Sequence, residues 1–262
     1  MSGRYQAPSV RKAFEILELV CRRRDGASLS ELSRELGISK STALGIADAL
    51  TDRGALVRDG GTKRWSPGLA LLRLGRAAHE RLDIRDAARP FMEGLGERTQ
   101  ETVFLGVRAG DHVYIVDAIQ SALEIKITSS VGTRIPLLAG ATGKVLMALL
   151  GEDEVRRIVL ARGLAAYTPR TVTDPESYFE KIREARQRGY ATDDEEYIEG
   201  VRAVAAAVRT SPESAVWVVG LTASMTDEKM ERIAAETAAA AAAIGRALEP
   251  AAGEEAMCPT ST

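Results

Sequence analysis

The chain has 262 residues, enough for two domains, and its composition of 45% hydrophobic and 27% charged residues is typical of a globular protein. This composition excludes collagen-like, disordered and membrane-spanning chains, because the apolar stretches are shorter than the roughly 18 residues that a membrane helix needs. The two cysteines, Cys21 and Cys258, and the two histidines cannot form a disulfide framework or a zinc site, so we expect no cofactor and no metal. No secretory leader is recognisable, and we expect a cytoplasmic protein.

The net charge of −2 conceals an asymmetry between the two parts of the chain. Residues 1–82 contain 15 Lys and Arg but nine Asp and Glu, a net charge of +6, whereas residues 83–262 have a net charge of −8. A basic N-terminal third on an acidic body indicates that only the first third contacts a polyanion.

The first predicted helix begins at Ser9 and ends before the stop signal Asp25-Gly26. Its apolar residues recur at three- and four-residue spacing, which is the period of a helix with one buried face. We expect that face to consist of Val10, Ala13, Phe14, Leu17 and Val20, widened by Ile16 and Leu19.

Two further short helices are predicted next. Ser28 and Glu31 form a capping-box pair that opens the first of them, and Gly37 supplies the left-handed residue that ends it. Ser39 can cap the second. Two short helices joined by a turn that contains glycine indicate a helix-turn-helix.

A basic β-hairpin is predicted directly after these helices. Residues 55–59 and 62–66 flank Gly60-Gly61, which we interpret as a two-residue hairpin turn. A helix-turn-helix followed at once by such a hairpin indicates a winged helix over residues 9–68. The alternative is a small helical dimerisation module.

The third helix exposes Lys40, Ser41 and Thr42 at its start, which a dimerisation module would not require. Short hydroxyl donors beside a lysine suit base edges and phosphates in a DNA major groove. We therefore predict that this segment binds DNA and that basic residues of the wing contact phosphates. The candidates are Ser39, Lys40, Ser41, Thr42, Leu44 and Gly45 in the helix, and Arg58, Lys63 and Arg64 in the wing.

Residues 69–82 carry another helical stripe of leucines and alanines, which we interpret as a linker helix between domains. A second domain is predicted over residues 83–249, beginning with a helix that Asp83 caps and Pro90 interrupts. Residues 250–262 are polar, and we expect a disordered tail with Cys258 as a free thiol.

Extended and helical segments alternate through the second domain. The predicted strands are residues 103–110, 112–119, 123–129, 190–193, 203–209 and 215–223. A small-residue loop, residues 137–144, opens a helix at Lys144, and further helices are expected at residues 152–162, 175–188 and 227–248. This order predicts an α+β chain whose second domain is a mixed α/β ligand-binding fold, not a parallel nucleotide-binding sheet.

Five segments together resemble the IclR-type transcriptional regulators, and the resemblance covers nearly all of residues 9–249. Two are the helix-turn-helix LSELSRELGISKSTALGIADAL and the wing GALVRDGGTKRWSPG. The others, in the second domain, are ARPFMEGLGERTQETVFLGV, VGTRIPLLAGATGKVLMALL and RGYATDDEEYIEGVRAVAAAV. The resemblance implies a winged helix, a GAF-like effector-binding domain that responds to a small molecule, and a homodimer or a dimer of dimers.

The chain departs from the pattern of this family at several positions. Leu138 stands where a histidine is frequent before the glycine-rich loop, and Ala203 and Ala207 stand where a cysteine and a proline are frequent. Leu44-Gly45 replaces a basic or aromatic pair that is common in the recognition helix. We therefore expect effector chemistry and an operator sequence particular to this chain.

The glycine-rich segment is the predicted effector site. Its glycines let the backbone approach a ligand closely, and the free N–H groups of the following helix would attract a carboxylate. The candidate residues there are Gly140, Ala141, Thr142 and Gly143. By resemblance, the same pocket has the polar residues Asp193, Thr222 and Ser224, and the apolar residues Ile127, Ile135, Leu138, Val201 and Ala203.

Structural roles are the alternatives for several of these residues. Asp193 could cap a strand end or pair with a cation, and Thr142 could simply cap its helix. Lys144 is expected to point into solvent. The segment is not a P-loop, because Val145 stands where that motif requires Ser or Thr.

An enzyme is the rival function class, but no H-E-x-x-H or G-x-S-x-G motif occurs. We expect His79, His112 and the acidic turn with Glu195 and Glu196 to be solvated, and we predict no catalytic residue. The expected function is a repressor whose dimer binds a pseudo-palindromic double-stranded DNA operator, its DNA-competent population shifted by a small organic acid. The alternatives are an activator of the same family and a DNA-binding protein that needs no ligand.

Overall fold

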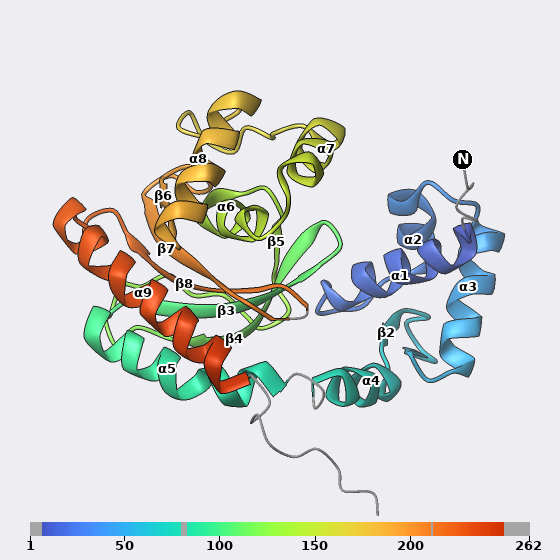
Figure 1. The fold of residues 1–262 in the computed structure, drawn as a ribbon. Helices are drawn as coiled ribbons and strands as arrows, with labels where there is room; N and C mark the ends of the chain where they lie inside the picture. The colour runs from blue at the N-terminus through green and yellow to red at the C-terminus, as the bar shows by residue number, and fades with distance from the viewer. Residues whose placement is uncertain (1–6, 80–82, 211, 249–262) are drawn as a thin grey trace, which may run out of the picture. The chain divides into compact units, whose positions relative to one another are not determined.

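The computed structural model describes residues 7–79, 83–210 and 212–248 (Figure 1). The last residues of the expected linker helix and the expected tail with Cys258 lie outside this range. The chain divides into two compact units, residues 1–82 (the first unit) and residues 83–262 (the second unit).

The first unit contains the expected helix-turn-helix and hairpin. Its elements are α1 (Pro8–Cys21), α2 (Leu29–Leu36), α3 (Lys40–Asp52), β1 (Leu56–Arg58), β2 (Trp65–Pro67) and α4 (Leu69–His79). The predicted capping box of Ser28 and Glu31 is present, and Gly37 ends α2 with a φ of 61°. The winged-helix prediction is therefore confirmed, with a core that includes Leu32, Ala47 and Trp65.

The predicted apolar face of α1 is only partly correct. Ile16, Leu19 and Val20 are buried, but Val10 and Phe14 are exposed. The buried contact with α2, α3 and β2 involves the C-terminal half of α1, so the apolar spacing continues beyond the part of the helix that packs. In α4, three leucines are exposed as well, namely Leu69, Leu72 and Leu74.

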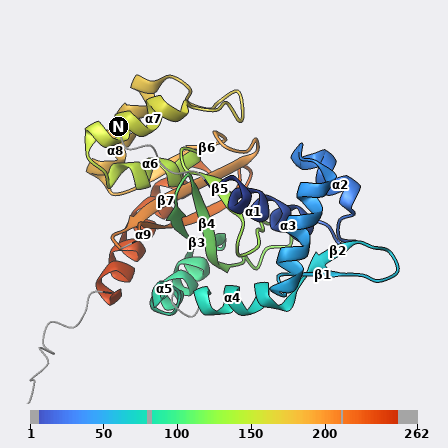
Figure 2. The same ribbon diagram turned by 90° about the vertical axis from the view of Figure 1, so that its right-hand side faces the viewer.

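The turn between β1 and β2 is longer than expected. Arg58 pairs with Trp65, so six residues connect the strands instead of two. The carboxylate of Asp59 organises this loop by accepting hydrogen bonds from the backbone N–H of Gly61 (3.1 Å) and of Thr62 (2.6 Å). The loop projects from the helices of the first unit (Figure 2).

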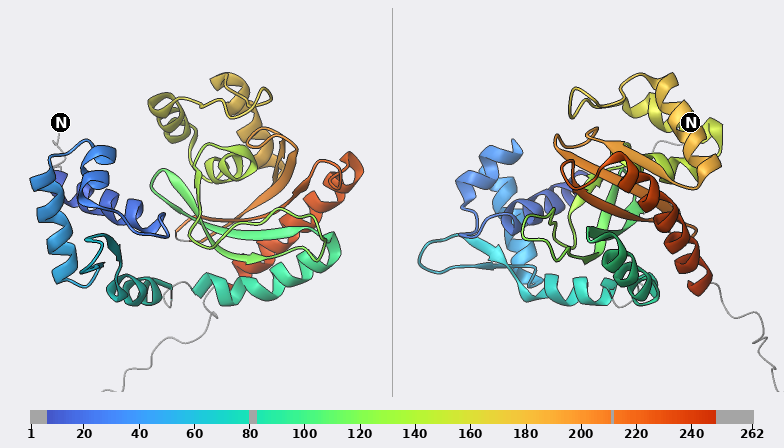
Figure 3. Two further views of the ribbon diagram at one scale, coloured as in Figure 1. Left: turned by 180° about the vertical axis from the view of Figure 1, so that it is seen from behind. Right: turned by 90° about the vertical axis from the view of Figure 1, so that its left-hand side faces the viewer.

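The second unit is built on an antiparallel sheet with helices on both faces (Figure 3). In the described residues the sheet has six strands in the order β5-β4-β3-β8-β7-β6. They are β3 (Thr102–Ala109), β4 (His112–Ile119), β5 (Arg134–Pro136), β6 (Ala191–Asp194), β7 (Val201–Val208) and β8 (Ser214–Leu221). The prediction of a mixed fold without a parallel sheet is confirmed.

Long helices cover the two faces of this sheet. On one face lie α5 (Asp83–Thr99) and α9 (Asp227–Leu248), and on the other lie α6 (Gly140–Ala148), α7 (Glu152–Arg162) and α8 (Pro175–Arg188). The core beneath α6 is apolar and includes Phe104, Leu146, Tyr178 and Trp217.

Pro90 and residues 123–129 contradict the expectations for the second unit. Pro90 lies inside α5 and does not interrupt it; Pro90 and Asp86 are both exposed, so water can satisfy the carbonyl that loses its donor. Residues 123–129 form a loop and not a strand, because the short strand β5 pairs with β4 in their place.

Candidate functional site

The start of α3 presents a cluster of hydroxyl groups. Ser39 is the N-cap and accepts a hydrogen bond from the backbone N–H of Thr42 at 3.1 Å. Its Oγ also lies 2.9 Å from the hydroxyl of Ser41 and 2.8 Å from that of Thr42. All three residues and Lys40 are exposed, so the helix end offers donors to an outside partner.

The neighbouring residues of α3 differ in what they expose. Leu44 packs partly against the core of the first unit, whereas Gly45 is exposed with open space where a Cβ would lie. Asp48 and Asp52 are exposed further along the helix. A polyanion would therefore be repelled by the C-terminal half of α3 and tolerated at its start.

The basic residues of the hairpin have different surroundings. Lys63 is exposed in the loop with a φ of 58°, and the guanidinium of Arg58 lies 4.5 Å from the ring centre of Trp65. Arg64, in contrast, donates to the backbone carbonyls of Asp25 (2.8 Å) and Gly26 (3.1 Å). It also donates to Glu31 at 2.8 Å, so its guanidinium holds the hairpin to the start of α2.

Glu31 is the acidic centre of this contact. Its carboxylate accepts hydrogen bonds from the backbone N–H and the hydroxyl of Ser28, both at 2.7 Å. These bonds, with the Arg64 guanidinium beside them, lower the pKa of Glu31 to about 2. The cap of α2 and the hairpin are thus joined through one ionised side chain.

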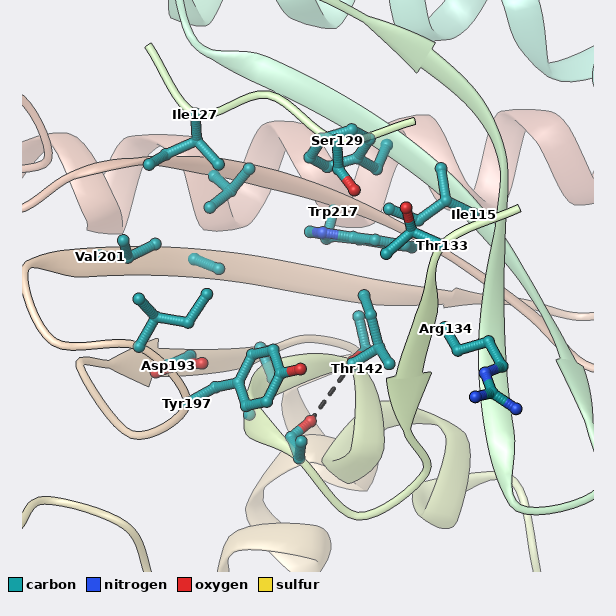
Figure 4. A pocket seen from close by; sticks show the side chains of 18 of the residues that line it. Ile115, Ile127, Ser129, Thr133, Arg134, Thr142, Asp193, Tyr197, Val201 and Trp217 are labelled. Carbon is teal, nitrogen blue, oxygen red and sulfur yellow. Dashed lines mark hydrogen bonds between the residues drawn. The ribbon is translucent and has the colours of Figure 1, made fainter. Parts of the chain in front are cut away.

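The second unit contains a cavity of about 210 Å³ between the sheet and α6 (Figure 4). Eight of the twelve predicted effector residues line it: Ile127, Ile135, Gly140, Ala141, Thr142, Asp193, Val201 and Ala203. Others were missed, among them Phe104, Ile115, Ser129, Thr133, Tyr197 and Trp217. The lining is mainly apolar, with polar groups at a few points.

Four predicted residues are not among those that line the cavity. Leu138 packs against the core while its carbonyl accepts a hydrogen bond from Tyr178 Oη at 3.0 Å, and Gly143 lies against the backbone of Leu137 and Leu138. Thr222 and Ser224 follow the end of β8, beyond the cavity-lining residues Trp217 and Val219 of that strand.

The ring of Trp217 forms the floor of the cavity. A Cβ at Gly106 would come within 2.8 Å of this ring, so the two strands can approach only because residue 106 lacks a side chain. The ring of Phe104 lies 5.5 Å from that of Trp217, centre to centre. An aromatic surface of this kind suits a flat apolar ligand.

The glycine-rich segment is the first turn of a helix and not a loop. Helix α6 starts at Gly140, after the N-cap Ala139, and not at Lys144 as expected. Gly140 has a φ of 56°, and a Cβ there would lie 2.3 Å from Oδ2 of Asp193. The carboxylate that approaches the N-terminus of α6 is therefore one of the protein's own.

Asp193 has a structural role and also lies where the predicted site residues line the cavity. It is 7% exposed, lines the cavity, and accepts a hydrogen bond from the backbone N–H of Glu196 at 2.7 Å. Burial raises the pKa of this carboxyl to about 6. Asp193 thus exchanges its proton close to neutral pH.

Lys144 is buried, contrary to expectation, with 2% of its surface exposed. Its ammonium donates to the carbonyl of Thr192 at 2.9 Å and forms an ion pair with Glu196. The acidic turn after β6 is therefore not simply solvated: Glu196 is the counter-charge of a buried lysine.

The turn that carries Tyr197 is fixed from outside the cavity. Residues 163–174, between α7 and α8, provide Thr168, which donates to the carbonyl of Glu195, and Thr171, which donates to that of Glu196, each at 2.6 Å. The rings of Tyr167 and Tyr197 meet edge to face at 5.0 Å. This cavity wall is consequently tied to a second loop.

Comparison with known proteins identifies the family. Residues 76–246 match the family described as Bacterial transcriptional regulator IclR C-terminal, and residues 9–60 match the IclR helix-turn-helix domain. The chain belongs to the IclR family of transcriptional regulators. It therefore combines a DNA-binding helix-turn-helix with the ligand-binding C-terminal domain of that family.

Individual relatives agree with this assignment. The regulator XynR of Escherichia coli is 29% identical over 92% of this chain and 96% of its own length, and KdgR of the same organism is 32% identical over 76% of both. An IclR regulator structure from Alicyclobacillus acidocaldarius matches with a TM-score of 0.79 at 29% identity, over 93% of this chain and 99% of that one. These relatives are regulators and not enzymes.

A further relative was solved with a bound small molecule. It is an IclR homologue from Microbacterium hydrocarbonoxydans in complex with 4-hydroxybenzoate, with a TM-score of 0.76 at 26% identity, over 92% of this chain and 98% of that one. In the described part of this IclR-family chain, no group of acidic, His or Cys residues could hold a metal. No helix there has the length and apolar content to cross a bilayer.

The contacts of the hairpin in this IclR-family chain give two neighbouring basic residues different roles. Changing Lys63 to Ala is expected to weaken binding to all DNA sequences alike. The salt dependence of the affinity should fall by the amount that one phosphate contact contributes, and the free energy of unfolding should stay unchanged. Changing Arg64 to Ala is expected to lower the free energy of unfolding of the first unit by about 2 kcal/mol, because two carbonyls lose this donor and Glu31 loses one of its donors. Thermal unfolding and DNA titrations at several salt concentrations measure both effects. If the Lys63 and Arg64 variants had the same free energy of unfolding, the assignment of a DNA contact to Lys63 and a structural contact to Arg64 would be contradicted.

Proposed function

We propose that this chain is a repressor that binds a pseudo-palindromic operator as a dimer and is released by a small organic acid. The observation that carries the proposal is the apolar cavity of about 210 Å³ in the C-terminal domain of a chain with a DNA-binding domain. A ligand that fits one state of the protein better than the other shifts the population between them. Repression is favoured over activation because the relatives AllR and IclR of Escherichia coli are named repressors.

The DNA-binding surface that we propose is the start of α3 with the adjacent loop of the hairpin. Ser41 and Thr42 supply short donors for base edges, and Lys40, Arg58 and Lys63 supply positive charge for phosphates. Gly45 leaves space for close approach of the helix. The net charge of +6 on residues 1–82 supports this choice, and Arg64 is left out because its guanidinium is used within the unit.

A second copy of the chain is the proposed partner. Val10 and Phe14 of α1 and the three leucines of α4 leave two apolar helix faces exposed in the first unit. Apolar faces of this kind commonly mark protein–protein contacts. A homodimer, or a dimer of dimers, would cover them and place two α3 helices at the spacing of successive major grooves.

The proposed effector is an organic acid with an apolar or aromatic body. The walls contributed by Ile115, Ile127, Val201 and Trp217 favour such a body, worth about 25 cal/mol for each Å² of apolar surface buried. The bound 4-hydroxybenzoate of the Microbacterium relative is a molecule of this class. The third possibility, a DNA-binding protein that needs no ligand, does not account for the cavity.

The proposal is tested with the full chain and the DNA region upstream of its own coding sequence. We expect salt-dependent binding in fluorescence anisotropy, and release by benzoate-sized acids at lower concentration than by pyruvate. Changing Ser41 to Ala should weaken binding to this DNA by about 1–3 kcal/mol and leave random DNA unaffected.

Two results would refute the proposal. Binding that does not distinguish this DNA from random DNA would remove the operator function. Operator binding that no acid of the series changes would remove the effector part. Tighter binding in the presence of an acid would instead support the activator or co-repressor alternative.

A further inference from the structure

One end of the cavity is formed by a hydrogen-bond acceptor. Asp193 lies there with one carboxylate oxygen, Oδ1, bonded to the N–H of Glu196 and the other, Oδ2, against Gly140 of α6. In Figure 4, Asp193 and Tyr197 lie on one side of the Trp217 ring, Ser129 lies on the other, and Thr133 lies beside the end of the ring that is farther from Asp193. The cavity therefore has an acidic end and a hydroxyl-lined end, with apolar walls between them.

A ligand carboxylate is disfavoured at the acidic end. It would face the charge of Asp193 at short range, and like charges that share a site resist joint ionisation. The cation on α6 that faces Asp193 is Lys144, and its ammonium is already held by Glu196 and the carbonyl of Thr192. The negative charge that a helix N-terminus attracts is thus supplied by Asp193 itself.

We propose that the effector carries a hydroxyl or amino group that donates a hydrogen bond to Asp193, with its acid group at the opposite, hydroxyl-lined end. The effector is then a hydroxy or amino acid with an apolar spacer, and a simple acid without a donor is a poor match. This assignment rests on the proposed function, because it takes the cavity as the effector site. A close analogue that lacks the hydroxyl group leaves the buried acceptor without a donor, and the cost of that unpaired acceptor weakens its binding.

Phenol and toluene isolate the donor, because they have nearly the same shape and differ in one hydroxyl group. Their dissociation constants for the full chain are measured by ligand-observed NMR or calorimetry at pH 7.5, without DNA. The quantity of interest is the ratio of the two constants in each protein. Changing Asp193 to Asn should shift this ratio against phenol by about tenfold, since a hydrogen bond to a charged acceptor becomes one to a neutral acceptor.

Changing Glu199 to Gln is the matched control. Glu199 is exposed in the turn that follows β6, does not line the cavity, and loses the same charge. The ratio should stay as in the wild type. An equal shift in both variants would overturn the assignment, because it would mean a general charge effect.

The wild type provides a second test that needs no variant to fold. The pKa of Asp193 is about 6, so the preference for phenol should fall when the pH is lowered from 7.5 to 5. The titratable groups that face Asp193 are Lys144 of α6 and Glu196 and Tyr197 of the turn.

Three results would overturn the inference: a ratio unchanged by both the pH and the Asp193 variant, tighter binding of phenol after Asp193 is changed, or no binding of either probe at millimolar concentration. None of these measurements involves DNA. Failure of the proposed regulation would appear in the operator titrations alone, and the two failures are therefore distinguishable.

Discussion

Replacing Glu196 by Gln is expected to lower the free energy of unfolding of the second unit by about 3 kcal/mol. The substitution keeps the size of the side chain but removes the charge that balances Lys144. The ammonium is almost completely buried and would retain the carbonyl of Thr192 as its acceptor. Urea denaturation of the full chain, followed by circular dichroism, measures the change.

An exposed ion pair on the same unit provides the control. Arg156 and Glu176 are 3.1 Å apart, with 47% and 67% of their side chains exposed. Changing Glu176 to Gln should alter stability by less than about 0.5 kcal/mol, because water replaces the lost partner. Changing Lys144 to Met together with Glu196 to Gln should recover part of the loss, because no unpaired charge stays buried. An unaltered urea midpoint for the Glu196 variant would contradict the burial of this pair.

Replacing Gly140 by Ala is expected to cost about 3 kcal/mol of stability in the second unit. The positive φ of 56° accounts for about 1–2 kcal/mol, since an L-residue with a side chain is strained in that conformation. The remainder comes from the new Cβ, which would lie 2.3 Å from Oδ2 of Asp193 and must displace it. Thermal and urea unfolding report the sum.

Gly110 separates these two contributions. Its φ is 59°, nearly that of Gly140, but an added Cβ would meet nothing within 4 Å. Changing Gly110 to Ala should therefore cost only about 1–2 kcal/mol. Combining Gly140→Ala with Asp193→Ala should cost less than the two single changes added together, because the second change removes the overlapping atom. If the Gly140 and Gly110 variants were equally stable, the close approach of Asp193 would be wrong.

The elements that the sequence predicted well are those with strong local signals. The capping box at Ser28 and the left-handed glycine at Gly37 act within a few residues, so the boundaries of α2 follow from local chemistry. The expected bounds of α8, residues 175–188, also agree with the structure, in which Asp174 is the N-cap and Gly189 the C-cap. The absence of a parallel nucleotide-binding sheet was predicted from the order of helices and strands as a whole, whereas the strand order itself was not predicted.

The errors arise where tertiary contacts, and not local sequence signals, determine burial and strand pairing. Residues 141–147 of α6 are buried on every side, so the polarity of Lys144 could not reveal its environment. Pairing with β4 selects β5 over residues 123–129, although β5 has only three residues. Val10 and Phe14 follow the helical period of α1 but reach beyond the part of the helix that packs.

The lining of the cavity was predicted in part for a related reason. The glycine-rich segment and Asp193 carry recognisable chemistry, and of these residues Gly140, Ala141, Thr142 and Asp193 line the cavity. Phe104 and Trp217 look like ordinary core residues in their strands, and nothing in their spacing separates a cavity floor from a packed core. Thr222 and Ser224 were taken from the family pattern, and they lie beyond the cavity-lining part of β8.

The contact between Trp217 and Gly106 restricts which substitutions this cavity can accept during evolution. A Cβ at residue 106 would overlap the indole ring, so a larger residue there requires a smaller side chain at residue 217. Ala141 and Ala203 also line the cavity, where a larger side chain would reduce the space for a ligand. New effector preferences should therefore evolve, or be selected from libraries, through single substitutions of these two alanines while the aromatic floor is inherited unchanged.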